Sequence, residues 1–294
     1  MNKVFKILFN VIFLVFLMIS SFKKKLKVCL CSPGKKENAY LREFVEYYKS
    51  YKVDKIFLYD NNDILGESFE EVIDDYIKTG YVEVINFRGK KRAQFNMLND
   101  CYKKNYLYYD WLIFYDIDEY IYLKNYNNIK NFLNQDKFKN CDTIQLNWLM
   151  HTDNNKVYYE NKSLNIRFPN SDKSIIRPAV KSILKGKMPN IEINCVHRIN
   201  TKLKTCNGFG LKTNLTDATT ELYDYNYYYI DHYFCKSTEE FVNKINKGDV
   251  MFDTDYTLKR VEVYFAVNNA TEEKINYMKK YLFQNISFDN IKIK

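Results

Sequence analysis

Residues 111–122 read WLIFYDIDEYIY, and this stretch decides how the chain folds. An apolar run, Trp111–Tyr115, is followed at once by the carboxylates Asp116, Asp118 and Glu119. A short apolar run bounded by acids is typical of a buried strand that brings its charges to the edge of a sheet. Alternate residues of an extended chain point the same way, so Asp116 and Asp118 are expected to reach one divalent cation together. The alternative is an ordinary acidic turn after a core strand.

A second Asp-x-Asp pair, Asp253 and Asp255, competes with the first as a metal-binding motif. It follows only the short sequence Val-Met-Phe at 250–252, which is a weak strand pattern. Its position therefore favours Asp116 and Asp118 as the functional pair.

The segments around 111–122 alternate between strand-like and helix-like patterns, which predicts an α/β domain with a mostly parallel sheet and flanking helices. Strands are expected at 28–32, 55–59, 82–87, 111–115, 142–147, 179–184 and 227–233, and helices at 38–49, 69–78, 94–106, 238–247 and 271–283. Ligands of such sheets bind beyond the carboxyl ends of the strands. Asp60, after the second strand, is thus expected on the same edge as Asp116.

Length and charge restrict the class of protein. The 294 residues are enough to bury a full core in one large domain. The net charge is +9, but residues 1–27 carry six lysines and no acid, so the basicity belongs mainly to the N-terminus. No stripe of arginines interleaved with aromatic residues is present, which argues against a nucleic-acid partner.

The N-terminus predicts association with a membrane. Residues 7–22 are apolar except for Asn10, Ser20 and Ser21, and lysines flank them on both sides. A membrane span needs roughly 17–25 apolar residues, so this segment is borderline, and a cleaved signal peptide is the alternative. The lysines directly downstream favour an uncleaved anchor over 1–26, with the catalytic domain at 27–294. Lysines on both sides leave the orientation of the anchor open.

The cysteines indicate a reducing compartment rather than a disulfide framework. Seven cysteines make an odd number, and no pair has the spacing of a zinc site. Cys29 and Cys31 lie in the first expected strand, where cysteine behaves as a small hydrophobe.

Several motifs, taken in order, resemble the glycosyltransferases of the GT-A fold, in the family 2-like and family 92 group, which transfer sugars from nucleotide donors. The matching pieces cover roughly residues 27–249 and include KKENAYLREFVEYY (35–48), VDKIFLYDNND (53–63), AQFNMLNDCY (93–102), DWLIFYDIDEYI (110–121), NWLMHTDNNKVYYE (147–160), VKSILKG (180–186), CVHRI (195–199) and DHYFCKSTEEFVNKINKGD (231–249). The chain departs from the pattern at Lys36, Phe44 and Asp231, all outside the Asp-x-Asp pair.

The resemblance implies a GT-A sheet and a donor site at its carboxyl edge. It places Ser32 and Glu37 against the nucleotide and Asp60 against the base or ribose. It assigns Asp116 and Asp118 to a metal ion and the diphosphate of the donor. Inversion at the transferred sugar is implied by the resemblance alone.

Sugar transfer needs a neutralised diphosphate, for which Mn²⁺ or Mg²⁺ held by Asp116 and Asp118 is expected. Lys181 and Lys236 are candidates for charge-assisted contacts to the same phosphates, unless they are solvated surface charges. His232 is a candidate third metal ligand, since a ligand from the C-terminal half is common in this fold. The alternative for His232 is a satisfied structural histidine.

The base that activates the acceptor hydroxyl must be a carboxylate or histidine within hydrogen-bond reach. Asp153 is the first candidate, and its alternative is a turn residue in Asp-Asn-Asn. Glu119 is the second candidate, or else a residue that orients Asp118. The expected partners are a nucleotide-sugar donor and a glycan, lipid or protein-linked acceptor. A catalytically inactive, membrane-tethered carbohydrate-binding relative is the rival interpretation, against which the intact carboxylate pair argues.

Overall fold

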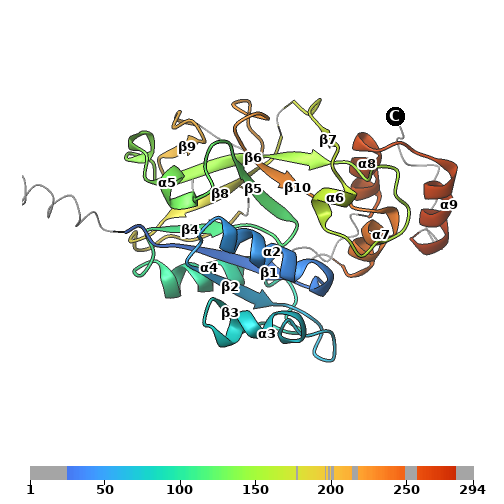
Figure 1. Cartoon of the computed structure of the whole chain (residues 1–294), viewed down its shortest axis with the longest axis horizontal. Coiled ribbons are helices and arrows are strands. Elements are labelled where there is room, and N and C mark those ends of the chain that lie inside the picture. The colour runs from blue at the N-terminus through green and yellow to red at the C-terminus, as the bar shows by residue number, and fades with distance from the viewer. Residues whose placement is uncertain are drawn as a thin grey trace, which may run out of the picture.

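One mixed β-sheet runs through the centre of the molecule (Figure 1). A computed structural model describes residues 25–176, 178–195, 197, 199, 202–213, 218–248 and 257–282. The strands are β1 (Val28–Gly34), β2 (Lys55–Asp60), β3 (Val82–Asn86), β4 (Trp111–Phe114), β5 (Glu119–Leu123), β6 (Thr143–His151), β7 (Ser171–Asp172), β8 (Val180–Lys185), β9 (Thr205–Asn207) and β10 (Tyr228–His232). Their order is β3-β2-β1-β4-β8-β6-β10-β5, with β7 and β9 paired to β6.

The sheet is parallel from β3 to β4, as the alternation of strands and helices predicted. Beyond β4 it becomes mixed, because β8 runs antiparallel to both of its neighbours, β4 and β6. Strand β10 runs parallel to β6 and antiparallel to β5. The predicted α/β class, with a largely parallel sheet flanked by helices, is confirmed.

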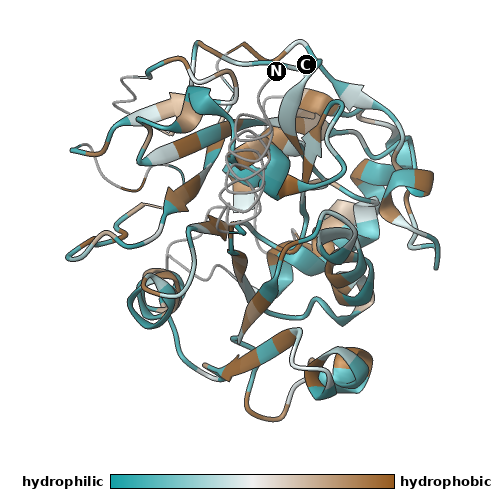
Figure 2. Cartoon of the chain, turned by 60° about the vertical axis from the view of Figure 1, so that its left-hand side comes forward, coloured by the Kyte–Doolittle hydropathy of each residue, from teal (hydrophilic) through white to brown (hydrophobic). Residues whose placement is uncertain are grey.

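Helices cover both faces of the sheet. They are α2 (Asn38–Ser50), α3 (Glu70–Lys78), α4 (Gln94–Asn105), α5 (Ile129–Leu133), α6 (Leu164–Arg167), α7 (Thr238–Asn246), α8 (Thr257–Val267) and α9 (Glu272–Tyr281). Alternate residues of a strand face opposite sides, and β1 shows the consequence. Leu30 packs in one core cluster with Phe44 of α2, whereas Cys29 packs in a second cluster with Met97 of α4. Figure 2 shows the helices banded in brown and teal, as expected where one face of a helix is buried.

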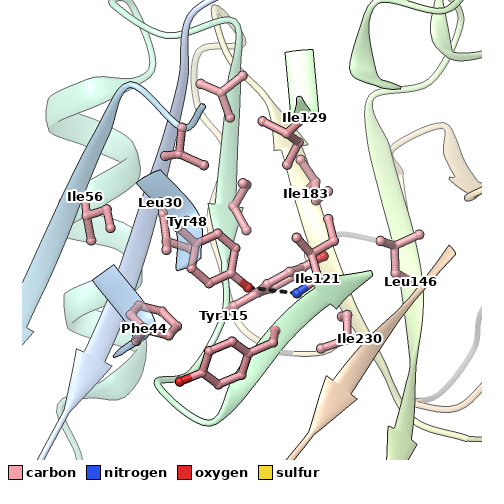
Figure 3. Packing of buried hydrophobic residues seen from close by; sticks show 14 of the residues in the cluster. Leu30, Phe44, Tyr48, Ile56, Tyr115, Ile121, Ile129, Leu146, Ile183 and Ile230 are labelled. Carbon is pink, nitrogen blue, oxygen red and sulfur yellow. Dashed lines mark hydrogen bonds between the residues drawn. The ribbon is translucent and has the colours of Figure 1, made fainter. Parts of the chain in front are cut away.

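Helix α2 also fixes the position of β5 (Figure 3). The Tyr48 hydroxyl donates to the Glu119 carbonyl at 2.7 Å and accepts from the Ile121 amide at 3.2 Å. Tyr48 is fully buried beside Phe44 and Tyr115 in the same cluster. The strand that follows the Asp-x-Asp pair is therefore anchored to the helix layer.

The carboxyl ends of β1, β2 and β4 lie at one edge of the sheet. Asp60 is the last residue of β2 and pairs with Gly34 at the end of β1, while Asp116 follows β4 on the other side of β1. The prediction that Asp60 and Asp116 share an edge is confirmed. A Cβ atom added to Gly34 would lie 2.5 Å from Cδ1 of Ile117, so β1 approaches the Asp-x-Asp turn as closely as a glycine allows.

Three C-terminal helices form a separate small core at one end of the sheet, in orange and red in Figure 1. Phe241 of α7, Tyr264 of α8 and Met278 of α9 meet there. Within the described residues, none of the helices has the length and apolar character that crossing a membrane requires. The predicted anchor segment 7–22 lies outside the described residues and stays a prediction.

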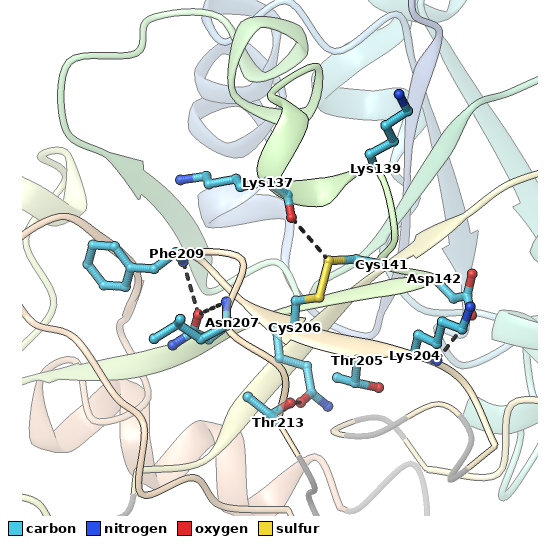
Figure 4. Close-up of a disulfide and its surroundings, with 12 residues drawn as sticks. Lys137, Lys139, Cys141, Asp142, Lys204, Thr205, Cys206, Asn207, Phe209 and Thr213 are labelled. Carbon is cyan, nitrogen blue, oxygen red and sulfur yellow. Dashed lines mark hydrogen bonds between the residues drawn. A yellow bond between two sulfur atoms is a disulfide. The ribbon is translucent and has the colours of Figure 1, made fainter.

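Four of the seven cysteines form disulfides. The prediction that the cysteines do not form a disulfide framework is therefore wrong. Cys31 of β1 is joined to Cys101 of α4, and Cys141, just before β6, is joined to Cys206 of β9 (Figure 4). Such bonds persist in oxidising rather than reducing compartments. Each closes a loop of 65 to 70 residues. Closing loops of this size typically stabilises a fold by about 2–4 kcal/mol.

Candidate active site

A cleft of about 230 Å³, open to solvent, lies at the carboxyl edge of the sheet. Residues of β1, β10 and α7, and the turn that follows β4, line it. Its charged and imidazole side chains are Lys35, Glu37, Asp116, Asp118, Lys181, His197, His232, Lys244, Lys247 and Arg260. Cationic side chains outnumber carboxylates in the lining, which favours an anionic ligand.

The Asp-x-Asp pair sits in a tight turn, and not on the extended chain that the sequence predicted. The Glu119 amide donates to the Asp116 carbonyl at 3.0 Å, and the Asp116 amide donates to Oε2 of Glu119 at 3.0 Å. The side chain of Glu119 is fully buried. Glu119 thus closes the turn from behind, which supports the interpretation of this residue as one that orients the pair.

Each carboxylate of the pair has its own lysine. Oδ2 of Asp116 lies 2.6 Å from Nζ of Lys181, which is also 3.2 Å from Oε1 of Glu119. Oδ2 of Asp118 lies 2.5 Å from Nζ of Lys244 on α7. The prediction that Lys181 reaches the site is confirmed in position, and it is a buried residue, not a solvated one.

Burial and charge act in opposite directions on these acids. Burial raises the pKa of the Glu119 carboxyl to about 8. Burial also acts to raise the pKa of Asp118, but the positive charges of Lys244 and its neighbours outweigh it and hold that pKa well below its usual range. Asp118 is therefore ionised at neutral pH and available to a cation.

His232 faces Asp118 from β10. Its Nε2 atom lies 3.7 Å from Oδ1 of Asp118, and its ring centroid is 4.1 Å from that of Trp148. The Nδ1 atom is buried and has no hydrogen-bond partner among the described residues. Burial lowers the pKa of this histidine well below its usual value, so the ring is neutral, which is the form that binds metals.

The donor set fits a hard divalent cation only in part. In the described part of the chain no three His, Cys, Asp or Glu side chains are grouped as a metal site. Asp116 and Asp118 nevertheless line the same cleft. Mg²⁺ is commonly held by one or two carboxylates together with substrate phosphates, without an all-protein cage. Two carboxylates are the number of protein ligands that a cation of that kind needs.

Besides Lys181, four residues were predicted to contact the nucleotide or its phosphates, and the structure places only one of them in the cleft. Glu37 lines the cleft, where one oxygen pairs with Lys247 and Oε2 has no hydrogen-bond partner among the described residues. Ser32 is buried within β1 and Lys236 is buried under the ring of Tyr40, 4.0 Å from its centroid. Neither Ser32 nor Lys236 lines the cleft. The structure therefore does not place either side chain where it could contact a ligand in the cleft.

Asp60 holds a loop. Its carboxylate accepts from the Arg88 guanidinium at 2.9 Å and from the Asn62 amide at 2.9 Å. The same guanidinium donates to the carbonyls of Asp63 and Gly66. Asp60 does not line the cleft. Its position at the sheet edge is as predicted, but its carboxylate organises the loop after β2.

Asp153, the first candidate for the base, is a structural residue. Its carboxylate accepts from the Asn155 amide at 2.8 Å and the Tyr264 hydroxyl at 2.5 Å, and it lies 2.6 Å from Nζ of Lys274. Asp153 is 1% exposed and Lys274 is fully buried. The carboxylate is enclosed against α8 and α9 and does not line the cleft. The turn interpretation, weighed as the alternative, describes it correctly.

Lys244 and Lys247 are the site residues that sequence reasoning missed. They lie three residues apart at the end of α7, a spacing that puts both on one face of a helix. The segment 238–247 was predicted as a helix inside a matched motif, so the lysine spacing was the signal available. Lys247 also donates to the carbonyl of Lys35, which ties α7 to the loop after β1.

Comparison with known proteins assigns this arrangement to a family. The sequence pattern of Glycosyltransferase family 92 matches residues 24–261. The galactan beta-1,4-galactosyltransferase GALS1 of Arabidopsis thaliana is 30% identical over 90 residues, which make up 28% of this chain and 18% of that protein. The similarity to this relative therefore covers only a small part of its length.

Two solved structures are similar at low sequence identity. TarS of S. aureus, residues 1–349 in complex with UDP, is 13% identical, with a TM-score of 0.40 over 90% of this chain and 76% of that chain. The mannosyltransferase PcManGT of Pyrobaculum calidifontis, in complex with GDP-Man and Mn²⁺, is 9% identical, with a TM-score of 0.33 over 42% of this chain and 36% of that chain. The family match, which spans most of the chain, decides the assignment: the chain belongs to glycosyltransferase family 92.

Proposed function

We propose that this glycosyltransferase moves a sugar from a nucleoside-diphosphate sugar to a hydroxyl of a glycan, lipid or protein-linked acceptor. In our proposal the reaction depends on Mn²⁺ or Mg²⁺ and inverts the transferred sugar. The observation that carries the proposal is the cleft itself, in which Asp116 and Asp118 lie among several lysines at the carboxyl edge of the sheet. Carboxylates for a cation and ammonium groups for phosphates are the two kinds of group that a departing diphosphate needs.

The lysines are suited to the charge of the diphosphate. Lys181 and Lys244 already touch the carboxylate pair, and Lys35 and Lys247 lie in the same lining. Their ammonium groups can donate charge-assisted hydrogen bonds to phosphate oxygens as negative charge develops on the leaving group. Lys181 is buried and positioned by β8, so this donor costs little reorganisation, whereas Lys244 is more exposed and can move toward a phosphate.

Asp116 and Asp118 are the residues that would hold the divalent cation, with His232 as a candidate further ligand. The cation would supply Lewis-acid stabilisation of the leaving diphosphate. Glu119 fixes the turn that carries the pair, and Tyr48 fixes the strand behind it.

Neither of the two predicted candidates for the base, Asp153 and Glu119, lines the cleft, so we propose a histidine in that role instead. His197 and His232 do line it, and burial lowers the pKa of both. Both imidazoles are therefore neutral at neutral pH, and since His232 is the candidate metal ligand, His197 is the candidate for the base. Inversion needs such a group opposite the leaving diphosphate.

Release of nucleoside diphosphate from a panel of UDP- and GDP-sugars tests the function. The full-length protein in detergent is expected to release diphosphate from one donor class, with Mn²⁺ or Mg²⁺ present and not with EDTA. Galactose-bearing donors come first, because the Arabidopsis relative is named a galactosyltransferase. Activity that ignores chelation contradicts metal dependence. Binding of sugars with no donor turnover across the panel supports the rival interpretation of an inactive carbohydrate-binding relative.

A further inference from the structure

In the described structure, both carboxylates of the Asp-x-Asp pair already carry a cation from the protein. Lys181 of β8 contacts Asp116, and Lys244 of α7 contacts Asp118, at 2.6 Å and 2.5 Å. Both are close charge-assisted contacts. A divalent cation that takes the same oxygens must displace the ammonium groups, because two positive centres repel each other strongly at such separations.

The two lysines differ in their freedom to leave. Lys181 is 2% exposed and contacts Glu119 as well as Asp116, so it keeps an oxygen partner if Asp116 turns to a metal. The side chain of Lys244 is 20% exposed, and its Nζ atom lies 4.4 Å from the ring centroid of Phe234. A lysine side chain is long and flexible, so the Lys244 ammonium can swing within the cleft.

We propose that Lys244 is a diphosphate-binding residue that occupies Asp118 until the donor arrives. When donor and divalent cation bind together, Lys244 exchanges Asp118 for a donor phosphate, and Asp118 becomes a metal ligand. This inference rests on the proposed function and adds a coupling between its two ligands. The metal binds weakly by itself, and the diphosphate and the metal each raise the affinity of the protein for the other. Such coupling is reciprocal, since each ligand raises the affinity of the other by the same factor.

Lys247 provides a matched control. It lies three residues further along, lines the same cleft and carries the same charge, but its partner is Glu37 and not the Asp-x-Asp pair. Replacing either lysine with glutamine removes one positive charge from the same cleft. Only Lys244→Gln removes the counter-ion of Asp118.

The experiment measures two affinities on the full-length protein in detergent: that for Mn²⁺ alone, by the paramagnetic resonance of the free ion, and that for UDP or GDP with Mn²⁺ present, by titration calorimetry. Lys244→Gln is expected to tighten Mn²⁺ binding by about tenfold or more and to weaken nucleoside diphosphate binding by about tenfold, since a hydrogen bond to a charged group has that worth. Lys247→Gln is expected to leave the affinity for Mn²⁺ within about twofold of wild type, because its charge is screened and lies on another carboxylate.

Exchange predicts that the affinity for Mn²⁺ rises while the affinity for nucleoside diphosphate falls. General damage to the site instead lowers both affinities. Lys244→Met, which keeps an unbranched apolar side chain at this position, is expected to repeat the result and guards against a packing defect in the glutamine variant. Unchanged or weaker Mn²⁺ binding in both Lys244 variants overturns the inference while the proposed function stands. A wild-type protein that binds neither Mn²⁺ nor UDP nor GDP, singly or together, overturns the proposed function and the inference with it.

Discussion

Replacing Asp116 or Asp118 with alanine is expected to reduce sugar transfer by at least about 10²- to 10³-fold, the typical cost of removing one group that stabilises developing charge. Each substitution removes an oxygen ligand of the expected cation, and the leaving diphosphate then loses part of its neutralisation. Initial rates of nucleoside diphosphate release, measured over a range of Mn²⁺ concentrations, give the size of the loss. Excess Mn²⁺ is expected to restore little activity, because the ligand itself is missing.

Both variants are expected to fold. The Asp116 side chain is 34% exposed, and Lys181 keeps Glu119 as a partner without it. Asp118 is buried, but its partner Lys244 is partly exposed and can turn to water. The second pair, Asp253 and Asp255, supplies the control: the same substitutions there are expected to leave transfer intact. Loss of activity from the second pair and not from the first contradicts the assignment.

Replacing Asp153 with alanine is expected to lower the free energy of unfolding by about 3–5 kcal/mol, the usual cost of removing one partner of a buried ion pair. The change leaves the fully buried ammonium of Lys274 without its carboxylate and removes the acceptor of the Tyr264 hydroxyl. Chemical denaturation with the linear extrapolation method measures the loss. α8 and α9 dock through this contact, so we expect them to be released first.

Asp153→Asn separates structure from catalysis. It keeps an acceptor for the Asn155 amide but loses the charge that Lys274 needs, so it too is expected to be less stable. The folded fraction is expected to keep kcat close to that of wild type. A base at this position instead predicts a loss of about 10²- to 10⁴-fold in kcat. Such a loss in a variant with wild-type stability contradicts the structural role.

The first half of the fold was predictable because its signals are local. Strands β1 to β4 and helices α2 to α4 appear where apolar spacing put them, since both patterns are set by the faces that must be buried. Strand β5 was missed because Glu119–Leu123 continues the apolar stretch that begins at Trp111, and only the turn at 116–119 divides the two strands. A short turn within such a stretch hardly changes the spacing of its apolar residues, so the spacing does not reveal the turn.

The site was predictable where a residue's position follows from its strand. Asp116, Asp118 and His232 reach the cleft because β4 and β10 deliver them there, and Lys181 does so from β8. Asp153 was misassigned because its partner, Lys274, lies more than 100 residues away on a helix whose docking no local pattern reveals. The four bridged cysteines were misjudged for the same reason, since the separations of 65 and 70 residues give no spacing signal.

The central claim is that Asp116 and Asp118 hold a divalent cation against the diphosphate of a nucleotide sugar. Anomalous diffraction from crystals of the protein grown with Mn²⁺ and a nucleoside diphosphate tests it most directly. The account predicts one manganese peak within ligand distance of both carboxylates, with phosphate oxygens completing its coordination and Lys181 and Lys244 beside them. A nucleotide bound in this cleft with manganese elsewhere, or with the two lysines still paired to the carboxylates and no metal present, contradicts it.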